Sequence, residues 1–183
     1  MRVITGSARG ARLLAPEGLQ TRPTSDMAKE AIFSILHFDL EQAMVLDLFA
    51  GSGQLGIEAL SRGAKFAVFV DRSREAQEVI RKNLAATKLS SQARVAAMEA
   101  EAYLSGCKER FDIALLDPPY DSGLLDRVLA QVADRMNENG IIVCEMEKNA
   151  PLPTQTGTFS LAKEYRYGKA KIVTYKKRRE EDE

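Results

Sequence analysis

The sequence has few of the residues that usually build metal sites. Among its 183 residues there are two cysteines, one histidine and no tryptophan. Cys107 and Cys144 lie far apart, with no C-x-x-C spacing and no histidine beside either of them. We therefore predict two free, buried thiols and no metal site. His37 lies in a stretch with a helical pattern, where a packing or surface role is the ordinary one, and we assign it no function.

Long apolar runs are also missing. No stretch approaches the roughly 20 apolar residues that span a bilayer. The start of the chain, MRVITGSARG, has no apolar core of a secretory signal. We therefore expect a cytoplasmic protein with no membrane partner. At 183 residues the chain fits one domain of ordinary size, and we expect it to act as a monomer.

The chain has no excess of either charge, because 26 Lys and Arg balance 26 Asp and Glu. A net charge of zero argues against a nucleic-acid partner, but the distribution of charge is uneven. Basic residues gather at both ends, with Arg2, Arg9, Arg12 and Arg22 at the start and Lys169, Lys171, Lys176, Lys177, Arg178 and Arg179 before a final EEDE. These clusters fit an RNA-binding surface and, equally, a solvated face with a charged tail.

From Met44 onward, apolar β-rich runs alternate with helical stretches, which predicts βαβ units and a mainly parallel sheet. The predicted strands are 45–49, 66–71, 93–97, 111–117 and 141–147, with a turn over 137–140 before the last. The predicted helices are 54–63, 75–88, 100–105 and 124–136. The predicted fold class is therefore α/β, with helices on both faces of the sheet.

Both ends of the chain depart from this alternation. Residues 158–177 contain two alternating runs joined through residues 167–169, which predicts an antiparallel hairpin at the end of the sheet. At the start, RVITGS and ARLLAP can pair as a small hairpin, followed by a helix over 26–40 with Ser25 as its N-cap. We divide the single domain 1–183 into an extension, 1–43, that could face the substrate as a flap, a core, 44–177, and a charged tail, 178–183.

A glycine-rich loop follows the first predicted strand of the core. Gly51, Gly53 and Gly56 match G-x-G-x-x-G, and Asp71 stands at the end of the next strand. Glycines let the backbone approach a nucleotide-like cofactor, and an acid at the tip of the second strand accepts hydrogen bonds from ribose hydroxyls. The first strand contains Asp47, whose carboxylate repels a pyrophosphate and tolerates a cationic sulfonium. A tight turn without a ligand is the structural alternative.

The tetrapeptide DPPY, residues 117–120, directly follows the apolar strand FDIALL at the same edge of the sheet as the glycine loop. The lone pair of an exocyclic base amine is delocalised into the ring, so its methylation needs acceptors aimed at the amine hydrogens. Asp117 and a backbone carbonyl of Pro118 or Pro119 can supply them, and the prolines stiffen the turn. Tyr120 offers a face on which a flipped or unpaired base stacks. We predict that these four residues are catalytic; a rigid turn with a packed tyrosine is the alternative.

The run VLDLFAGSGQLGIEAL followed by DPPY resembles the class I, seven-stranded methyltransferases that act on exocyclic amines. The opening, RVITGSARGARLLAPEGLQTRPTSDMAKEAIFSIL, is similar to the start of the bacterial 16S ribosomal RNA guanine-N2 methyltransferases, the RsmD family. The likeness extends through EYRYGKAKI near the end. It implies a Rossmann-like fold, S-adenosylmethionine as the cofactor, and transfer of a methyl group to N2 of a guanine in 16S ribosomal RNA. The substrate is naked RNA, the small ribosomal subunit or an assembly intermediate.

The resemblance also implies roles for individual residues. The cofactor is expected to contact Asp47, Gly51 and Gly53 at its methionine end, Asp71 at its ribose, and Glu99 and Ala100 at its adenine. Phe49, Arg72 and Asp117 are also expected to contact it. Glu99 departs from the Asp or Asn expected at that position, and an ordinary acid at a helix start explains it equally well. The segment expected to close over cofactor and substrate contains Arg22, Pro23 and Thr24, and the residues expected to touch RNA are Arg9, Arg12, Arg22 and Lys169.

Three other functions stay open. A DNA adenine-N6 or cytosine-N4 methyltransferase shares the [DN]-P-P-[YFW] pattern, although so short a chain shows no separate target-recognition domain. A non-catalytic RNA-binding assembly factor could keep the same fold, although both motifs are intact in this sequence. A nicotinamide dehydrogenase would use the glycine loop alone.

Overall fold

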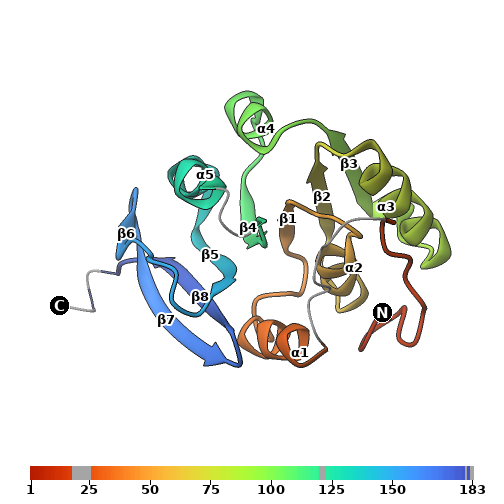
Figure 1. The fold of residues 1–183 in the computed structure, drawn as a ribbon, viewed down its shortest axis with the longest axis horizontal. Helices are drawn as coiled ribbons and strands as arrows, with labels where there is room; N and C mark the ends of the chain where they lie inside the picture. The colour runs from red at the N-terminus through yellow and green to blue at the C-terminus, as the bar shows by residue number, and fades with distance from the viewer. Residues whose placement is uncertain (18–25, 120–122, 180, 182–183) are drawn as a thin grey trace.

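The computed structural model describes residues 1–17, 26–119, 123–179 and 181. Its elements are α1 (Asp26–Ile35), β1 (Met44–Leu48), α2 (Gln54–Ser61), β2 (Phe66–Asp71), α3 (Arg74–Ala86), the 3-10 turn η1 (Ser90–Gln92), β3 (Ala93–Ala97), α4 (Ala100–Gly106), β4 (Phe111–Leu116), α5 (Leu124–Ala133), β5 (Met136–Glu147), β6 (Gln155–Thr156), β7 (Phe159–Tyr167) and β8 (Ala170–Lys177). The predicted alternation of strands and helices is confirmed (Figure 1). In the described part of the chain, each helix is too short or too polar to cross a bilayer.

One mixed sheet runs through the molecule in the order β3-β2-β1-β4-β5-β8-β7-β6. The strands from β3 to β5 are parallel, whereas β8, β7 and β6 each run antiparallel to their neighbours. The predicted C-terminal hairpin is confirmed, and Gly168 in its turn has a φ of 53°. The sheet has eight strands rather than seven, because the two-residue β6 pairs with the start of β7 at the edge.

The predicted turn over 137–140 is wrong, because these residues belong to β5. Phe111 pairs with Met136, but Ile113 pairs with Ile141, so β5 carries extra residues opposite β4. An irregularity of this kind is a β-bulge. The side-chain amide of Asn137 donates to a carboxylate oxygen of β4 at 2.8 Å, which ties the bulge to its neighbour. The polar run NENG therefore marks a bulge within a strand rather than a turn before one.

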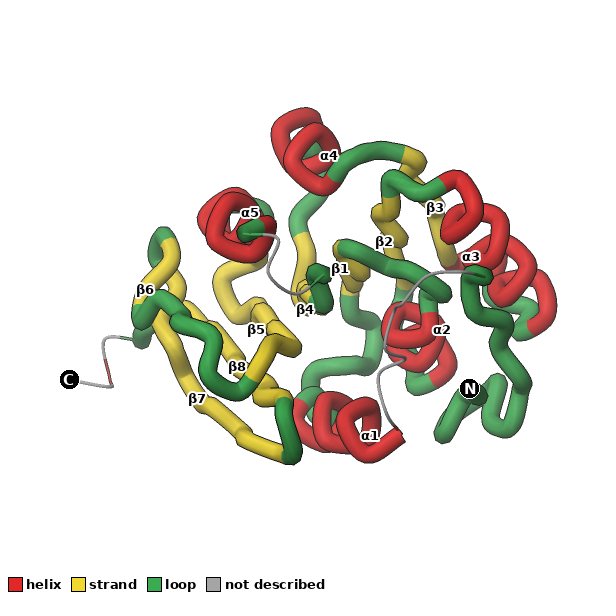
Figure 2. Tube along the Cα trace, in the orientation of Figure 1, coloured by secondary structure: helices red, strands yellow, loops and turns green. Residues whose placement is uncertain are grey.

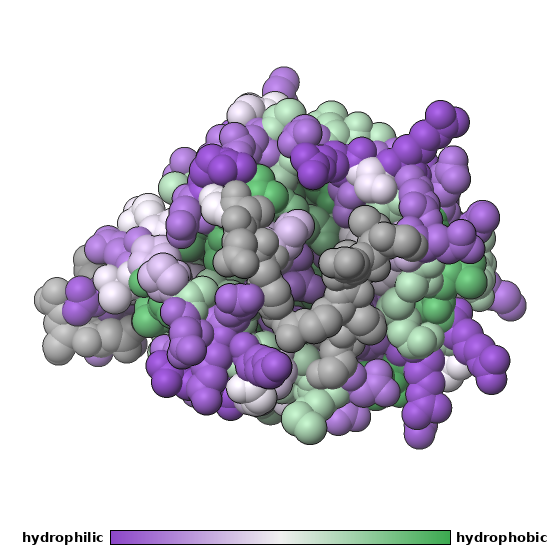
Figure 3. All heavy atoms as spheres, in the orientation of Figure 1, coloured by the Kyte–Doolittle hydropathy of each residue, from purple (hydrophilic) through white to green (hydrophobic). Residues whose placement is uncertain are grey.

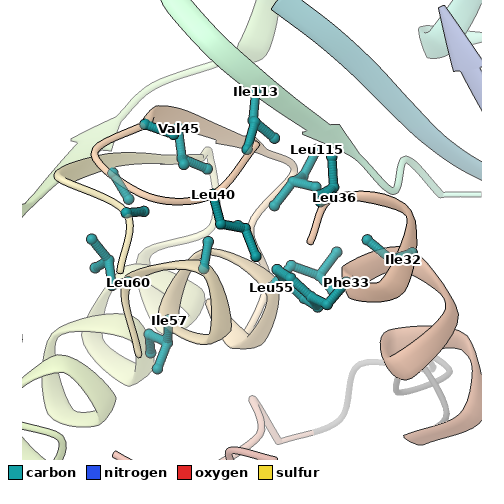
Figure 4. Packing of buried hydrophobic residues seen from close by; sticks show 14 of the residues in the cluster. Ile32, Phe33, Leu36, Leu40, Val45, Leu55, Ile57, Leu60, Ile113 and Leu115 are labelled. Atoms are coloured by element: carbon teal, nitrogen blue, oxygen red, sulfur yellow. The ribbon is translucent and has the colours of Figure 1, made fainter. Parts of the chain in front are cut away.

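Helices cover both faces of the sheet, and each face has its own apolar core. On one face α1, α2 and α3 pack against the strands; Figure 4 shows Phe33 of α1 close to Leu55 of α2. On the opposite face α4 and α5 pack against the alternate residues of the same strands. Alternation along a strand sends successive side chains to opposite faces, so a parallel strand covered on both sides is apolar throughout. Cys107 and Cys144 are buried and free, as predicted.

Residues 1–17, which we call the N-terminal segment, are held against α2 and α3. The segment turns back on itself through an antiparallel bridge between Arg2 and Arg12, which confirms the predicted small hairpin. Ser61 of α2 anchors it: its hydroxyl accepts the Ala8 amide at 2.9 Å and donates to the Thr5 carbonyl at 2.7 Å. The expected flap is therefore a docked segment as far as residue 17, and its remainder up to residue 25 lies outside the described residues.

The helix predicted over 26–40 is α1, which ends at Ile35 and continues into turns. Its predicted cap, Ser25, lies outside the described residues. Lys29 of α1 is fully buried and donates to the Arg2 carbonyl at 2.8 Å. Burial lowers the pKa of Lys29, and the nearby carboxylate of Glu58 opposes that shift. Since Glu58 also accepts the Ile4 amide at 2.9 Å, α1, α2 and the N-terminal segment form one packed unit.

Gly56 of α2 packs closely against the sheet, and this contact generates a first prediction. A β-carbon at this position would lie 2.4 Å from the ring of Phe69 in β2. Because that ring is fully buried, Gly56→Ala should lower the free energy of unfolding by about 1–3 kcal/mol through overpacking. Urea unfolding measures the change.

The matched control is Gly106→Ala at the end of α4, where an added β-carbon meets no atom within 4 Å. This change should be neutral or stabilise the protein by up to about 1 kcal/mol, since alanine is the better helix former. Equal losses of stability in the two variants would show that the approach of Gly56 to Phe69 is not the limiting contact.

Candidate functional site

The carboxyl ends of the central strands meet at one edge of the sheet. β1 lies between β2 and β4, and Leu48 at its end pairs with both Val70 and Leu116. The strand order reverses at this point, because β2 and β3 lie on one side of β1 and β4 and β5 on the other. Open α/β sheets bind their ligands at such a switch point. The loop after β1 and the DPP residues after β4 are therefore neighbours, as Figure 2 shows near the centre of the molecule.

The glycine loop, residues 49–53, has a conformation fixed by hydrogen bonds. The Ala50 amide donates to the Val70 carbonyl at 3.0 Å, the Gly51 amide to Asp71 Oδ2 at 2.9 Å, and the Gly53 amide to the Ala50 carbonyl at 2.8 Å. Gly51 and Gly53 have φ values of 58° and 80°, which favour glycine. A β-carbon on Gly51 would meet nothing within 4 Å, so open space lies beside the backbone where a cofactor is predicted.

Phe49 begins this loop with a φ of 62°, in the left-handed region. A residue with a side chain costs about 1–2 kcal/mol in that region, and such strain concentrates at functional sites. The ring is partly buried against the core beneath α4 and α5. The strained backbone supports the prediction that Phe49 borders the cofactor.

Asp47 lies beneath the glycine loop and is only 2% exposed. Its Oδ2 accepts the Gly56 amide at 2.9 Å, which caps the start of α2 because the N-cap residue, Gly53, has no side chain. Burial raises the pKa of Asp47 well above its usual range; the hydrogen bond from Gly56 opposes this, and the charges of Asp117 and Asp71 add to it. Three carboxyl groups thus converge on this edge, a charge distribution that suits a cationic ligand and disfavours a phosphate.

The residues predicted for the ribose and adenine lie along the ends of β2 and β3. Asp71 accepts the Ser73 amide at 2.9 Å, which fixes its carboxylate at the tip of β2. Arg72 and Glu99 form an ion pair at 3.7 Å, with both side chains more than half exposed. Such an exposed pair contributes little to stability. With Ala100 at the start of α4, these residues form one rim beside the glycine loop.

The predicted catalytic tetrapeptide follows β4 without a break. Pro118 is buried, Asp117 is half-buried and Pro119 is exposed. The charge of Asp117 acts on Asp47, which places the two motifs within electrostatic reach of each other. Tyr120 lies outside the described residues, as do the predicted closing residues Arg22, Pro23 and Thr24.

The residues predicted to bind RNA belong to two elements. Arg9 and Arg12 are exposed on the N-terminal segment, and Lys169 is exposed in the β7–β8 turn. The Lys169 carbonyl accepts the Lys148 amide at 2.9 Å, just beyond the carboxyl end of β5. This turn therefore lies at the same edge of the sheet as the glycine loop. Figure 3 shows hydrophilic side chains around much of the outline of the molecule in this orientation.

One buried residue of this region escaped the sequence reasoning. Asn83 of α3 is 1% exposed, and its side chain joins the glycine loop to the N-terminal segment. The available signal was its position on the apolar face of the helix, three residues after Ile80 and one before Leu84. A polar residue on such a face needs hydrogen-bond partners in the core.

Comparisons with known proteins fit this geometry. A family model described as "Conserved hypothetical protein 95" matches residues 1–176. Ribosomal RNA small subunit methyltransferase D of Escherichia coli (strain K12) is 34% identical over 179 residues, covering 97% of this chain and 90% of that protein. The chain belongs to the RsmD family. The α/β, Rossmann-like methyltransferase fold expected for the RsmD family is confirmed.

Solved structures agree with the RsmD assignment. The structure of yhhF from Escherichia coli has a TM-score of 0.87 and 35% identity, and the match covers 97% of both chains. The structure of SMU.776 complexed with SAH has a TM-score of 0.69 and 15% identity, covering 80% of this chain and 48% of that one. This second likeness concerns the fold alone.

The buried carboxyl of Asp47 leads to a second prediction, on stability against pH. Its folded-state pKa is raised, so the folded state holds the proton more tightly than the unfolded state, whose value is near 3.8. The contribution of Asp47 to stability therefore falls as pH rises from about 4 through the raised pKa. Asp47→Asn keeps an acceptor for the Gly56 amide and removes the charge. The free energy of unfolding of Asp47→Asn should therefore increase relative to that of the wild type as the pH rises.

Urea unfolding between pH 4 and pH 8 tests this for the wild type, Asp47→Asn and the control Asp39→Asn, which removes an exposed carboxyl. A stability difference between wild type and Asp47→Asn that stays constant over the whole range would contradict the prediction.

Proposed function

We propose that this chain transfers a methyl group from S-adenosylmethionine to the exocyclic N2 of a guanine in 16S ribosomal RNA. The observation that carries the proposal is the position of the glycine loop beside Asp117 at the switch point between β1 and β4. The E. coli relative is named for methylation of the small-subunit ribosomal RNA, which supports the substrate. With ribosomal RNA as the substrate, we place the reaction in the cytoplasm.

The cofactor site is the glycine loop with its neighbouring acids. The space beside Gly51 admits a ligand close to the backbone, and the converging carboxyl groups favour a sulfonium over a phosphate. SMU.776, a protein that shares this fold, was solved in complex with SAH. Bound here, S-adenosylmethionine supplies an electrophilic methyl group. We assign Phe49, Gly51 and Gly53 to its methionine end, with the carboxyl group of Asp47 beneath the loop.

The remaining cofactor contacts follow the rim described above. The carboxylate of Asp71 accepts two backbone amides, of Gly51 and Ser73, and has further lone pairs. These lone pairs can accept hydrogen bonds from the ribose hydroxyls. Arg72, Glu99 and Ala100 border the adenine. We assign to Arg22 and Thr24 the role of covering the bound cofactor and shielding it from solvent.

The substrate amine is bound by the residues after β4. The carboxylate of Asp117 and a carbonyl of the proline pair accept hydrogen bonds from the amine, which directs the nitrogen lone pair toward the methyl group. Tyr120 stacks on the flipped guanine. Catalysis on this proposal consists of positioning and acceptor electrostatics, with no covalent intermediate on the protein.

Contacts to the RNA backbone come from basic residues around the sheet edge. Arg9, Arg12 and Lys169 are exposed and belong to elements on either side of α1 (Figure 1). Their charges pair with phosphates, and Arg22 joins them from the segment before α1. Phosphate contacts of this kind position the substrate without selecting its sequence.

The substrate assignment is tested with small ribosomal subunits, and with their RNA, from cells that lack the gene. Labelled methyl groups should pass from S-adenosylmethionine to one of these substrates, and nucleoside mass spectrometry should detect N2-methylguanosine. Methylated adenine or cytosine in DNA would replace the proposal with DNA methylation. Binding of RNA without any transfer would replace it with an assembly factor.

The catalytic assignment gives a third prediction. Asp117→Ala should lower the rate of transfer at least about 100-fold, because the amine loses its charged acceptor. Its affinity for SAH, measured by calorimetry, should stay within a few fold of the wild-type value.

Asp134→Ala, which removes an exposed carboxyl just after α5, is the control and should transfer methyl groups at the wild-type rate. A wild-type rate in Asp117→Ala would exclude Asp117 from the chemistry.

A further inference from the structure

The glycine loop depends on side chains outside it for its conformation. Gly51 and Gly53 have no side chains to restrict their backbone, so their freedom must be removed by hydrogen bonds. Asp71 holds the Gly51 amide. The carbonyl of Ser52, between the two glycines, is held by Asn83 Nδ2 at 2.9 Å. The loop is therefore held by two side chains, Asp71 at the tip of β2 and Asn83 in α3.

Asn83 joins this loop to a second element, the N-terminal segment. Its Nδ2 donates to the Leu14 carbonyl at 3.0 Å, and its Oδ1 accepts the Leu14 amide at 2.8 Å. Both donor hydrogens and the acceptor of this buried amide are thus used. The two partners lie 31 and 69 residues away along the chain. A single side chain binds both backbones, and neither can move away without breaking a hydrogen bond to this buried amide.

Two more contacts connect the same segment to the cofactor side of the sheet. The Ser52 hydroxyl donates to the sulfur of Met1 at 3.4 Å. The Glu17 amide donates to Glu75 Oε1 at 2.6 Å, and Glu75 lies in the first turn of α3, just after the tip of β2. The N-terminal segment therefore meets the glycine loop and the ribose side of the site, while carrying the exposed Arg9 and Arg12.

We propose that Asn83 is a positioning residue that couples the N-terminal segment to the glycine loop, so that RNA bound to the segment and cofactor bound to the loop strengthen each other. The inference rests on the proposed function for the identity of the two ligands. Leu14 and Ser52 share one side chain, so a ligand that immobilises either backbone also restricts the other. By linkage, the factor by which RNA tightens the cofactor equals the factor by which the cofactor tightens RNA.

The first test measures SAH affinity by calorimetry in the absence of RNA. Asn83→Ala leaves the Ser52 carbonyl and the Leu14 backbone without their buried partner, and SAH affinity should fall about tenfold. Ser61→Ala is the matched control, because Ser61 anchors the same segment at residues 5 and 8 and has no contact with the glycine loop. SAH affinity in the control should stay within about twofold of the wild-type value.

The second test repeats the titration with the RNA substrate present. RNA should tighten SAH several-fold in the wild type and in Ser61→Ala, and should have a clearly smaller effect on SAH in Asn83→Ala, where only the contacts of Met1 and Glu17 remain. An Asn83→Ala protein that binds SAH as the wild type does, or that keeps the full RNA effect, overturns the inference. So does an equal loss of affinity in both variants, which indicates a general loosening of the segment.

Hydrogen exchange on the wild-type protein gives a readout that needs no variant. SAH should slow exchange of the Leu14 amide, which Asn83 holds, and should leave the Ala8 amide, which Ser61 holds, unchanged. Unchanged exchange at Leu14 contradicts the coupling. Failure of the wild type to bind SAH at all instead removes the proposed function together with the inference, so the two failures are distinguishable.

Discussion

The parallel pairing of β1 with β4 is the constraint on which the site depends. It brings together two loops that are more than sixty residues apart in the sequence, because each leaves the sheet one residue beyond the matched pair of Leu48 and Leu116. The reversal of strand order at this pair leaves no connecting helix between the two loops. A methyl donor and a nucleophile can therefore meet there without any large movement of the core.

The second constraint is the rigidity of the glycine loop. Three side chains surround it: Asp47 beneath, Asp71 at the next strand end and Asn83 in the neighbouring helix. Each accepts from or donates to a backbone group, so the strained conformation at Phe49 persists because its surroundings determine it. Binding to a loop that these bonds restrict costs less conformational entropy than binding to an unsupported glycine loop.

Sequence patterns predicted the layers of the fold and the edge where the site lies. Runs of apolar residues identified the buried parallel strands, and turn-forming residues at 167–169 identified the hairpin. The patterns failed where tertiary contacts decide the outcome. Residues 137–140 have turn composition, but the pairs that flank them, of Met136 and Ile141 with β4, and the bond from Asn137 keep them in β5. The two residues of β6 are too few for any periodicity.

The sequence motifs indicated which residues belong to the candidate site, but they did not indicate in which direction the side chains point. The motif predicted a cofactor contact for Asp47, and only the structure shows that its carboxylate turns inward to cap α2. Asn83 lies outside every motif, and its role depends on a partner 69 residues earlier in the chain. Contacts between residues so far apart leave no trace in local periodicity, because each half of the contact looks ordinary in its own helix or loop.

The docking of the N-terminal segment also sets an order for biosynthesis. Its amides are held by Glu58, Ser61 and Asn83, which follow them by 53 to 69 residues. When this segment leaves the ribosome these partners have not been made, and closing such long loops precedes any gain from the contacts. The N-terminal segment must therefore wait in an unfolded state until α2 and α3 have emerged, and although it is translated before them it reaches its native position after them.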